Sequence, residues 1–163
     1  INYNGYGSSL DDLHFHPDAL YESLLEAERP QPFLNSSTFR KLQQGYHQDL
    51  AASAALTPVV EEPAFAVYQL PNASWARRVS GVFSNDLVRA YPDRAHAVLT
   101  ERGDDSFLVS VRAPFERRTG AGTVCSQFET GGGREAAAGI NRLPADELGH
   151  LVNAMAAEYS GQP

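Results

Sequence analysis

The sequence contains very little sulfur and almost no lysine. Among its 163 residues, Cys125 is the one cysteine, and Lys41 is the one lysine among 13 basic residues. One cysteine excludes a disulfide framework and a zinc site made of cysteines. No apolar run approaches the roughly 20 residues that a membrane-spanning helix needs. We therefore expect a cytoplasmic protein with no membrane partner.

The charge is unevenly distributed along the chain. The formal net charge of −7 argues against a surface that coats nucleic acid in general. Residues 73–142, however, hold ten arginines against eight acidic residues, whereas residues 1–72 carry a net charge of −6. A GC-rich genome would also favour arginine codons. Because arginine binds phosphate through a planar fork, the cluster still predicts an anionic ligand, a small anion or a few nucleotides rather than long duplex.

Residue patterns predict a helical first third of the chain. We expect a strand running into a glycine loop over 1–10, helices over 17–28 and 36–56, a stiff connector at 29–32 and a linker over 58–63. The chain begins at Ile1, with neither a methionine nor a signal peptide before its first strand-like segment. The simplest expectation is a piece of a longer protein.

From residue 64 onward, strand and helix patterns alternate. We expect strands over 65–70, 95–100, 107–112 and 136–141, a hairpin turn at 102–105, and helices over 74–91 (broken near Gly81), 119–129 and 144–159. This order predicts an α/β fold with a mixed β-sheet flanked by helices, preceded by a helical connector. We divide the chain into a connector or domain remnant over 1–57 and one domain over 58–163.

The most distinctive motif is a run of three glycines followed by an arginine. Gly131, Gly132 and Gly133 carry no Cβ that would obstruct a ligand, and successive amide groups in such a loop can form an anion-binding nest. Arg134 follows directly and would add a charged fork. An ordinary flexible turn is an equally good interpretation from the residues alone.

A longer segment around this motif resembles a known family. Residues 106–142 resemble the C-terminal half of the DHHA1 domain of the DHH/RecJ superfamily of phosphoesterases, which has a strand ending in Ser-x-Arg, then a helix, then Gly-Gly-Gly-His followed by small residues and a glycine. The matching positions here are Ser110 and Arg112, Gly131 to Gly133, and Ala137, Ala138 and Gly139. The segment 79–87 also resembles the first helix and loop of that domain.

The resemblance implies that residues 58–163 are a substrate-binding domain. It would hold the phosphate end of a nucleotide or short oligonucleotide, or of a polyphosphate as in exopolyphosphatases. We expect the substrate-binding residues to be Arg112, Gly131, Gly132, Gly133 and Arg134, with Asn85 and Arg118 second. Arg134 stands where the family usually has histidine, so it can bind phosphate but cannot donate a proton near pH 7.

The family's catalytic centre is not expected in this chain. The resemblance places two manganese-type ions in a separate DHH domain, which includes an Asp-His-His triplet that this sequence lacks. We therefore expect no catalytic or metal-binding residue here, and we expect the DHH domain as a partner, with a homodimer as a further option. The alternative is a stand-alone module that binds nucleic acid or protein.

Other polar motifs have simpler interpretations. Asp11, Asp12, His14 and His16 have side chains that bind metals, and a metal-dependent hydrolase using them is a third hypothesis. Caps and turns explain such a segment better, because no third histidine lies nearby. For the remaining candidates we expect a solvated helix face at Arg77 and Arg78, surface or satisfied core histidines at His96 and His150, and a buried Cys125.

Overall fold

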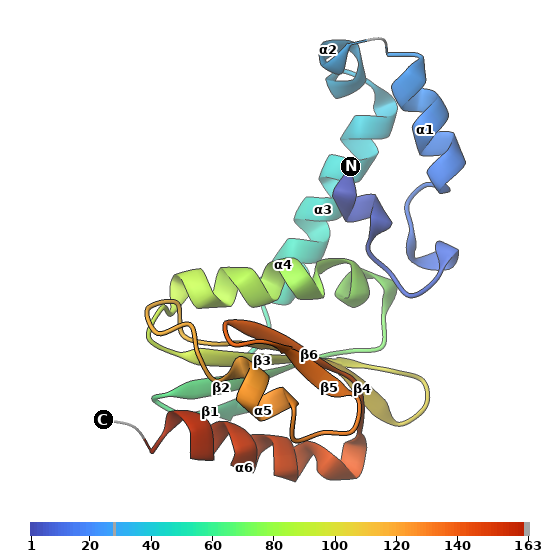
Figure 1. The fold of residues 1–163 in the computed structure, drawn as a ribbon. Coiled ribbons are helices and arrows are strands. Elements are labelled where there is room, and N and C mark those ends of the chain that lie inside the picture. Colours follow the sequence, from blue (N-terminus) through green and yellow to red (C-terminus); the bar gives the residue numbers. More distant parts are fainter. Residues whose placement is uncertain (28, 162–163) are drawn as a thin grey trace. The chain divides into compact units, whose positions relative to one another are not determined.

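The computed structural model describes residues 1–27 and 29–161, which form two compact units (Figure 1). The first unit contains residues 1–55 and 73–79, and the second contains residues 56–72 and the chain from Ser80 onward. Within these residues, no helix is long and apolar enough to cross a membrane.

The first unit is made of short helices. They are the 3₁₀ turns η1 (Asn2–Gly5) and η2 (Leu10–Asp12) and the helices α1 (Pro17–Leu25), α2 (Pro30–Leu34) and α3 (Ser37–Ala54). The caps agree with the sequence, since the side chains of His16 and Ser36 accept backbone hydrogen bonds at the starts of α1 and α3. A small apolar core of Leu20, Phe33 and Leu42 joins the three helices.

Two predictions for this unit are wrong. The strand expected over 1–10 is a pair of 3₁₀ turns, because the buried side chain of Asn4 fixes the segment by accepting the N–H groups of His14 and Phe15, both at 3.0 Å. The stiff connector at 29–32 is instead the start of α2, where Pro30 occupies the first turn that proline tolerates. The helix predicted over 17–28 ends at Leu25, and residue 28 lies outside the described residues.

The second unit is built on a six-stranded mixed sheet. Its strands are β1 (Val60–Glu61), β2 (Phe65–Leu70), β3 (Ala95–Glu101), β4 (Ser106–Arg112), β5 (Gly131–Arg134) and β6 (Ala137–Pro144), in the order β1-β2-β3-β4-β6-β5. The β2–β3 pair is parallel and the other pairs are antiparallel. This confirms the predicted α/β class with a mixed sheet.

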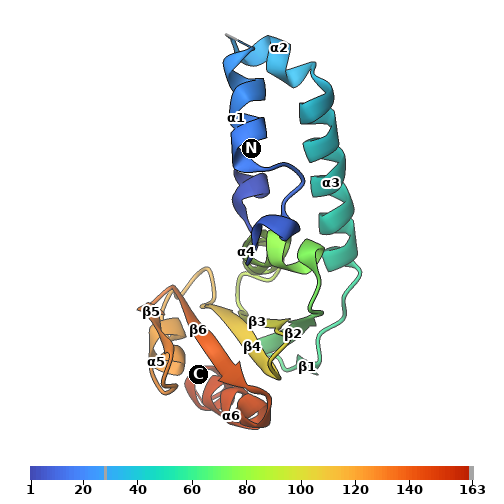
Figure 2. The same cartoon turned by 90° about the vertical axis from the view of Figure 1, so that its right-hand side faces the viewer.

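Helices cover the two faces of this sheet unequally. The short helix α5 (Ala121–Cys125), the turn η3 (Ala145–Glu147) and the helix α6 (Leu148–Tyr159) lie on one face, and the part of α4 (Ser74–Ala90) from Ser80 onward lies on the other (Figure 1). The large core lies between the sheet and α5 and α6 and includes Val109, Ile140 and Met155. The β5–β6 hairpin extends beyond α4 (Figure 2).

Burial along the strands shows where the sheet is left open. Every residue of β3 before Glu101 is buried, as expected for a strand covered on both faces. In β4, by contrast, Val109 and Val111 are buried while Leu108, Ser110 and Arg112 are exposed or half-buried. The α4 face is therefore open from β4 toward the β5 edge.

Several boundaries in this unit correct the sequence predictions. The helix α4 runs unbroken through Gly81, the predicted helix over 119–129 shrinks to five residues, and the predicted linker contains the strand β1. The last helix begins at Leu148, after a 3₁₀ turn, rather than at Pro144. Glycine inside a helix costs only about 1 kcal/mol, so the packing of neighbouring turns outweighs it in α4.

Two helical glycines are expected to change stability in opposite directions when each is replaced by alanine. A Cβ on Gly45 in α3 would collide with the His14 ring, whereas a Cβ on Gly81 in α4 meets nothing within 4 Å. We expect Gly45→Ala to lower the free energy of unfolding by about 1–3 kcal/mol through overpacking. The matched Gly81→Ala should raise it by about 0.5–1 kcal/mol through its better helix propensity. Urea unfolding of both variants checks this, and stabilisation by Gly45→Ala would contradict it.

The buried His96 makes stability depend on pH. Its ring is fully buried between Tyr68 and Tyr91, and burial together with the charge of Arg94 lowers its pKa from 6.5 to about 4. Because the folded state disfavours the proton, stability is complete above pH 6.5 and falls as the pH drops toward 4, by up to about 3 kcal/mol. Unfolding curves over this range should show a smaller loss for His96→Phe than for the wild type. Burial also lowers the pKa of His14. Both proteins contain His14, so its contribution cancels when the two unfolding curves are compared.

Candidate functional site

Strand pairing aligns two predicted site residues on the open face of the sheet. Arg112 of β4 pairs with Ala137 of β6, and Ala137 pairs in turn with Arg134 of β5. Residues paired across neighbouring strands project to the same face. The two arginines therefore project from one face with only an alanine between them.

The next row of paired residues on this face has only small side chains. Ser110 of β4 pairs with Gly139, which pairs with Gly132 at the edge of the sheet. These positions lie two residues from the arginine row, so they belong to the same face. Ser110 also positions Arg112, whose Nη1 donates a hydrogen bond of 2.8 Å to the serine Oγ.

A side chain from α4 fixes the other edge of Arg112. The Nε of Arg112 donates to Oδ1 of Asn85 at 3.1 Å. Since a guanidinium only donates, the amide oxygen of Asn85 must face it, and the Asn85 NH₂ group points elsewhere with donors to spare. The pKa of Arg112 is lowered, first by burial and then by the nearby charge of Arg134, so the two cations repel each other.

The loop after β4 contributes a third arginine. Arg118 has a left-handed backbone (φ 55°), which is uncommon outside glycine and is concentrated at functional sites. Its Nε donates to the Phe115 carbonyl at 3.1 Å, and its guanidinium lies 4.6 Å from the Phe115 ring centre. The loop is also tied to the β5–β6 turn, because the N–H groups of Gly120 and Ala121 donate to the Glu135 carboxylate (3.2 Å) and carbonyl (3.0 Å).

Some of these groups line a cavity of about 230 Å³, whereas Arg134 and the three glycines do not. It is lined by Asn85, Val88, Arg89, Arg112, Ala113, Phe115, Arg118 and Ala136. The structure thus brings together three residues predicted from sequence, namely Asn85, Arg112 and Arg118. Sequence reasoning missed Arg89 and Phe115. Arg89 lies one helical turn after Asn85, a spacing that would have revealed a shared face.

Three arginines at or beside this cavity differ from the other arginines of residues 73–142 in having no ion pair. Of the ten arginines in 73–142, seven form an ion pair with a carboxylate. Within the described chain, the three without one are Arg112, Arg118 and Arg134. Within residues 73–142, the arginines without an ion pair therefore lie near one another.

The glycine run forms a strand instead of the loop predicted from sequence. Gly131, Gly132 and Gly133 pair with β6 as the edge strand β5, so no curled anion nest is formed. At two of these positions the structure explains why the residue is glycine. A Cβ on Gly131 would collide with the Cys125 carbonyl. Gly133 has φ 143°, and a Cβ there would lie only 2.5 Å from Ala138. A Cβ on Gly132 meets nothing within 4 Å.

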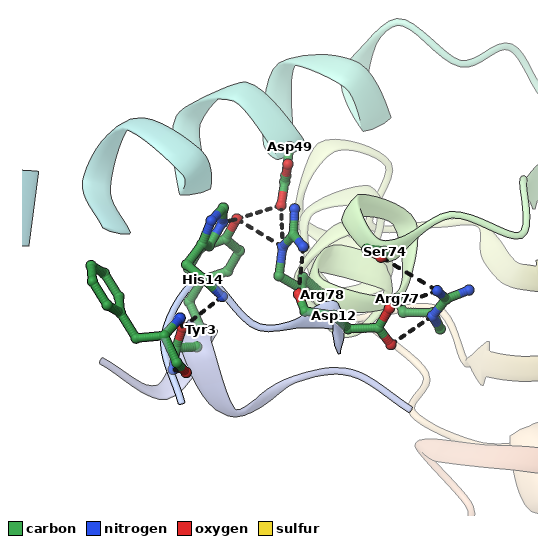
Figure 3. A network of polar contacts seen from close by, with 9 residues as sticks. Tyr3, Asp12, His14, Asp49, Ser74, Arg77 and Arg78 are labelled. Atoms are coloured by element: carbon green, nitrogen blue, oxygen red, sulfur yellow. Dashed lines mark hydrogen bonds and ion pairs between the residues drawn. The ribbon is translucent and has the colours of Figure 1, made fainter. Parts of the chain in front are cut away.

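A separate polar network lies within the first unit (Figure 3). Arg77 binds both carboxylate oxygens of the buried Asp12, at 2.8 and 2.6 Å, which holds the pKa of that carboxyl well below its usual range. Arg78 donates to Asp49 at 2.8 Å and to the Tyr3 hydroxyl at 3.1 Å. The solvated helix face predicted for the two arginines is therefore wrong.

The same network includes two of the four side chains of the metal hypothesis, those of Asp12 and His14. Asp12 accepts from Arg77 and from Ser8, and the Nε2 of His14 is hydrogen-bonded to the Tyr3 hydroxyl at 2.8 Å. Across residues 1–27 and 29–161, no group of three or more His, Cys, Asp or Glu side chains is placed to hold a metal ion. The segment 11–16 acts as a cap and a packing element.

Comparisons with known proteins connect this architecture to a fold. No protein-family model and no curated protein matches the sequence. The pGpG-specific phosphodiesterase PggH from Vibrio cholerae matches with a TM-score of 0.60 and 12% identity, over 89% of this chain and 53% of that one. A DHH domain described as a member of the s1p family of ribosomal proteins, PF0399, matches with a TM-score of 0.49 and 14% identity, over 91% of this chain and 36% of that one.

The similarity to the phosphodiesterase shows the fold. The chain has a DHHA1-like α/β fold, which confirms the resemblance found in the sequence at the level of architecture. It spans about half the length of that enzyme.

Alanine substitutions in the glycine run test the packing role of Gly131. We expect Gly131→Ala to lower the melting temperature clearly, because its Cβ has no room against the Cys125 backbone. Gly132→Ala should leave it unchanged or slightly higher, since alanine restricts the unfolded chain more than glycine does. Differential scanning calorimetry measures both, and equal melting temperatures for the two variants would contradict the packing role of Gly131.

Proposed function

We propose that this chain is the substrate-binding part of a DHH-type phosphoesterase and that it holds the phosphate end of a nucleotide or short oligonucleotide. The DHHA1-like fold supports the first half of this proposal. In the whole enzyme, a separate DHH domain would be the partner and would carry manganese or similar divalent ions. That domain would supply the attacking hydroxide.

The observation that carries the proposal is the gathering of unpaired arginines. Arg112, Arg118 and Arg134 come from β4, the following loop and β5, and within the described chain none of them has a carboxylate partner. The cavity beside them is lined by no acidic side chain. Cations held close together without counter-ions disfavour the unliganded state, so a bound anion would be stabilised by all three.

The geometry around Arg112 suits a phosphoester. Its Nε donates to Asn85 and its Nη1 donates to Ser110 and to the Val111 carbonyl, which leaves the N–H groups of Nη2 for a ligand. A guanidinium positioned in this way can donate to a phosphate oxygen with little further loss of side-chain freedom. The open backbone at Gly132 would let a phosphate approach the edge strand closely.

Arg134 has a binding role in this proposal and no acid–base role. An arginine keeps its charge at every physiological pH, so it cannot exchange a proton with a leaving group. The proposed chemistry of this site is therefore recognition and orientation of the substrate, while the reaction belongs to the partner domain.

Charge-neutralising variants test the proposal. In NMR titrations with a 5′-phosphorylated adenine dinucleotide, we expect Arg112→Gln and Arg134→Gln each to weaken binding by about 1.5–3 kcal/mol, the value of a charge-assisted hydrogen bond. Arg142→Gln is the matched control, because it removes the same charge from a surface pair with Asp104. At constant ionic strength it should bind like the wild type. Equal affinity for all four proteins would overturn the assignment.

A further inference from the structure

We propose that this chain pairs with a second copy of itself through the first unit, with helix α1 of each copy in an apolar groove of the other. The residues concerned lie outside the cavity and the arginines of the second unit. The pairing is therefore independent of the proposed function.

The first unit leaves more large apolar side chains exposed than it buries. Among residues 1–27 and 29–55, the buried apolar side chains are Tyr3, Leu20, Phe33 and Leu42. The large apolar side chains that are between 42% and 61% exposed are Ile1, Tyr6, Leu10, Tyr21, Leu25 and Leu34. Single exposed apolar residues are ordinary, but apolar surface that gathers in one place marks an interaction site.

Part of this surface is hollowed into a groove. A cavity of about 640 Å³ lies between η1, α1, α2 and the start of α3, and a second of about 350 Å³ lies between η1 and α3. Ile1, Tyr3 and Phe39 line both cavities, so the two adjoin each other. Together they form the apolar groove, and the exposed Leu34 of α2 belongs to its wall.

The charge of the apolar groove restricts what can fill it. Among the described residues, its lining contains one arginine, Arg29, and no aspartate or glutamate. The exposed Arg29 has no ion pair with any carboxylate of residues 1–27 or 29–161. A complementary occupant therefore presents apolar side chains with acidic groups beside them.

Helix α1 presents such a surface on its exposed side. Tyr21 and Leu25 lie one helical turn apart and are 61% and 59% exposed. Asp18 lies three residues before Tyr21, and Glu22 lies three residues before Leu25, so a carboxylate borders each apolar side chain. Both acidic residues are exposed, and Asp18 also contacts the exposed His16 at 3.5 Å.

The position of this surface allows a closed pair. Leu24 lines the apolar groove and precedes Leu25 in α1, so the exposed side of α1 borders the groove. In a two-fold dimer the same patch serves both copies, and the two groove contacts form together. An acidic helix of a different protein would cover the groove but leave Tyr21 and Leu25 in water. A second copy of this chain covers both surfaces.

Sedimentation equilibrium over a wide range of protein concentration tests the pairing. We expect a monomer–dimer equilibrium. Tyr21→Ser combined with Leu25→Ser should raise the dissociation constant at least about tenfold, because burying even one large apolar side chain is worth that much. Leu108→Ser is the matched control, since Leu108 is 43% exposed in the second unit, and it should leave the constant unchanged. Circular dichroism checks that each variant is folded.

A charge reversal tests the groove side of the contact. Arg29→Glu would place a carboxylate against the acidic side of α1, so it should also raise the dissociation constant at least about tenfold. Arg40→Glu changes the net charge equally at an exposed position outside the groove, and it should dimerise like the wild type.

A nitroxide label locates the contact. Ala19 is exposed on α1, and Cys125 is buried, so Ala19→Cys takes the label at one position. Mixed with an isotope-labelled chain that carries no nitroxide, it should broaden the amide NMR signals of Leu34 and Phe39 in the groove of the other copy.

Several outcomes would overturn the proposal. They are a monomer at every concentration, a dissociation constant that Tyr21→Ser with Leu25→Ser does not change, and broadening that spares the groove. A mass that keeps growing with concentration would mean open head-to-tail association and would overturn the closed pair. Arg112→Gln should dimerise like the wild type, so a failure of the pairing and a failure of phosphate binding are distinguishable.

Discussion

The pairing register of β4 with β6 is the constraint on which the second unit depends. Side chains alternate strictly along a strand, so a slip by one residue would turn Arg112 into the core and Val111 out to the surface. The pairing of Ser110 with Gly139 holds this register, because a Cβ on Gly139 would lie 2.8 Å from the Val109 carbonyl oxygen. The core on one face and the arginine row on the other are consequences of the same alignment.

Charge compensation distinguishes two kinds of arginine in this chain. In the first unit, Arg77 and Arg78 each have a buried carboxylate partner, and their charges are used to hold distant segments of the chain together. In the second unit, Arg112 has neutral partners that orient it without cancelling its charge. Arginines of the first kind serve folding, and an arginine of the second kind keeps its electrostatic attraction for a ligand.

Much of the fold could be read from the sequence because its strands and turns are locally specified. Phe65–Leu70 is a strand with the predicted bounds, and the hairpin after residue 101 is signalled by glycine and aspartate. The failures occur where tertiary contacts decide. Asn4 fixes the first turns by bonds to residues ten positions away, and the glycine run becomes a strand because β6 offers it a partner.

The candidate site could be predicted only in part, because its contacts join elements that are distant in the sequence. A resemblance to a family motif can identify Arg112 and the glycines, but it cannot show that Asn85 on another element reaches Arg112, nor that the glycines are extended. Arg77 and Arg78 illustrate the limit: a pair of arginines on a helix looks solvated until the carboxylates of Asp12 and Asp49, remote in sequence, are placed beside it.

The hydrogen bonds that the N–H groups of Gly120 and Ala121 donate to Glu135 have a mechanical consequence. They clamp the tip of the β5–β6 hairpin, which carries Arg134, to the end of the loop that carries Arg118. The hairpin and the loop are thus joined by two hydrogen bonds, so a shift of one segment would pull on the other and change the spacing of Arg118 and Arg134 together.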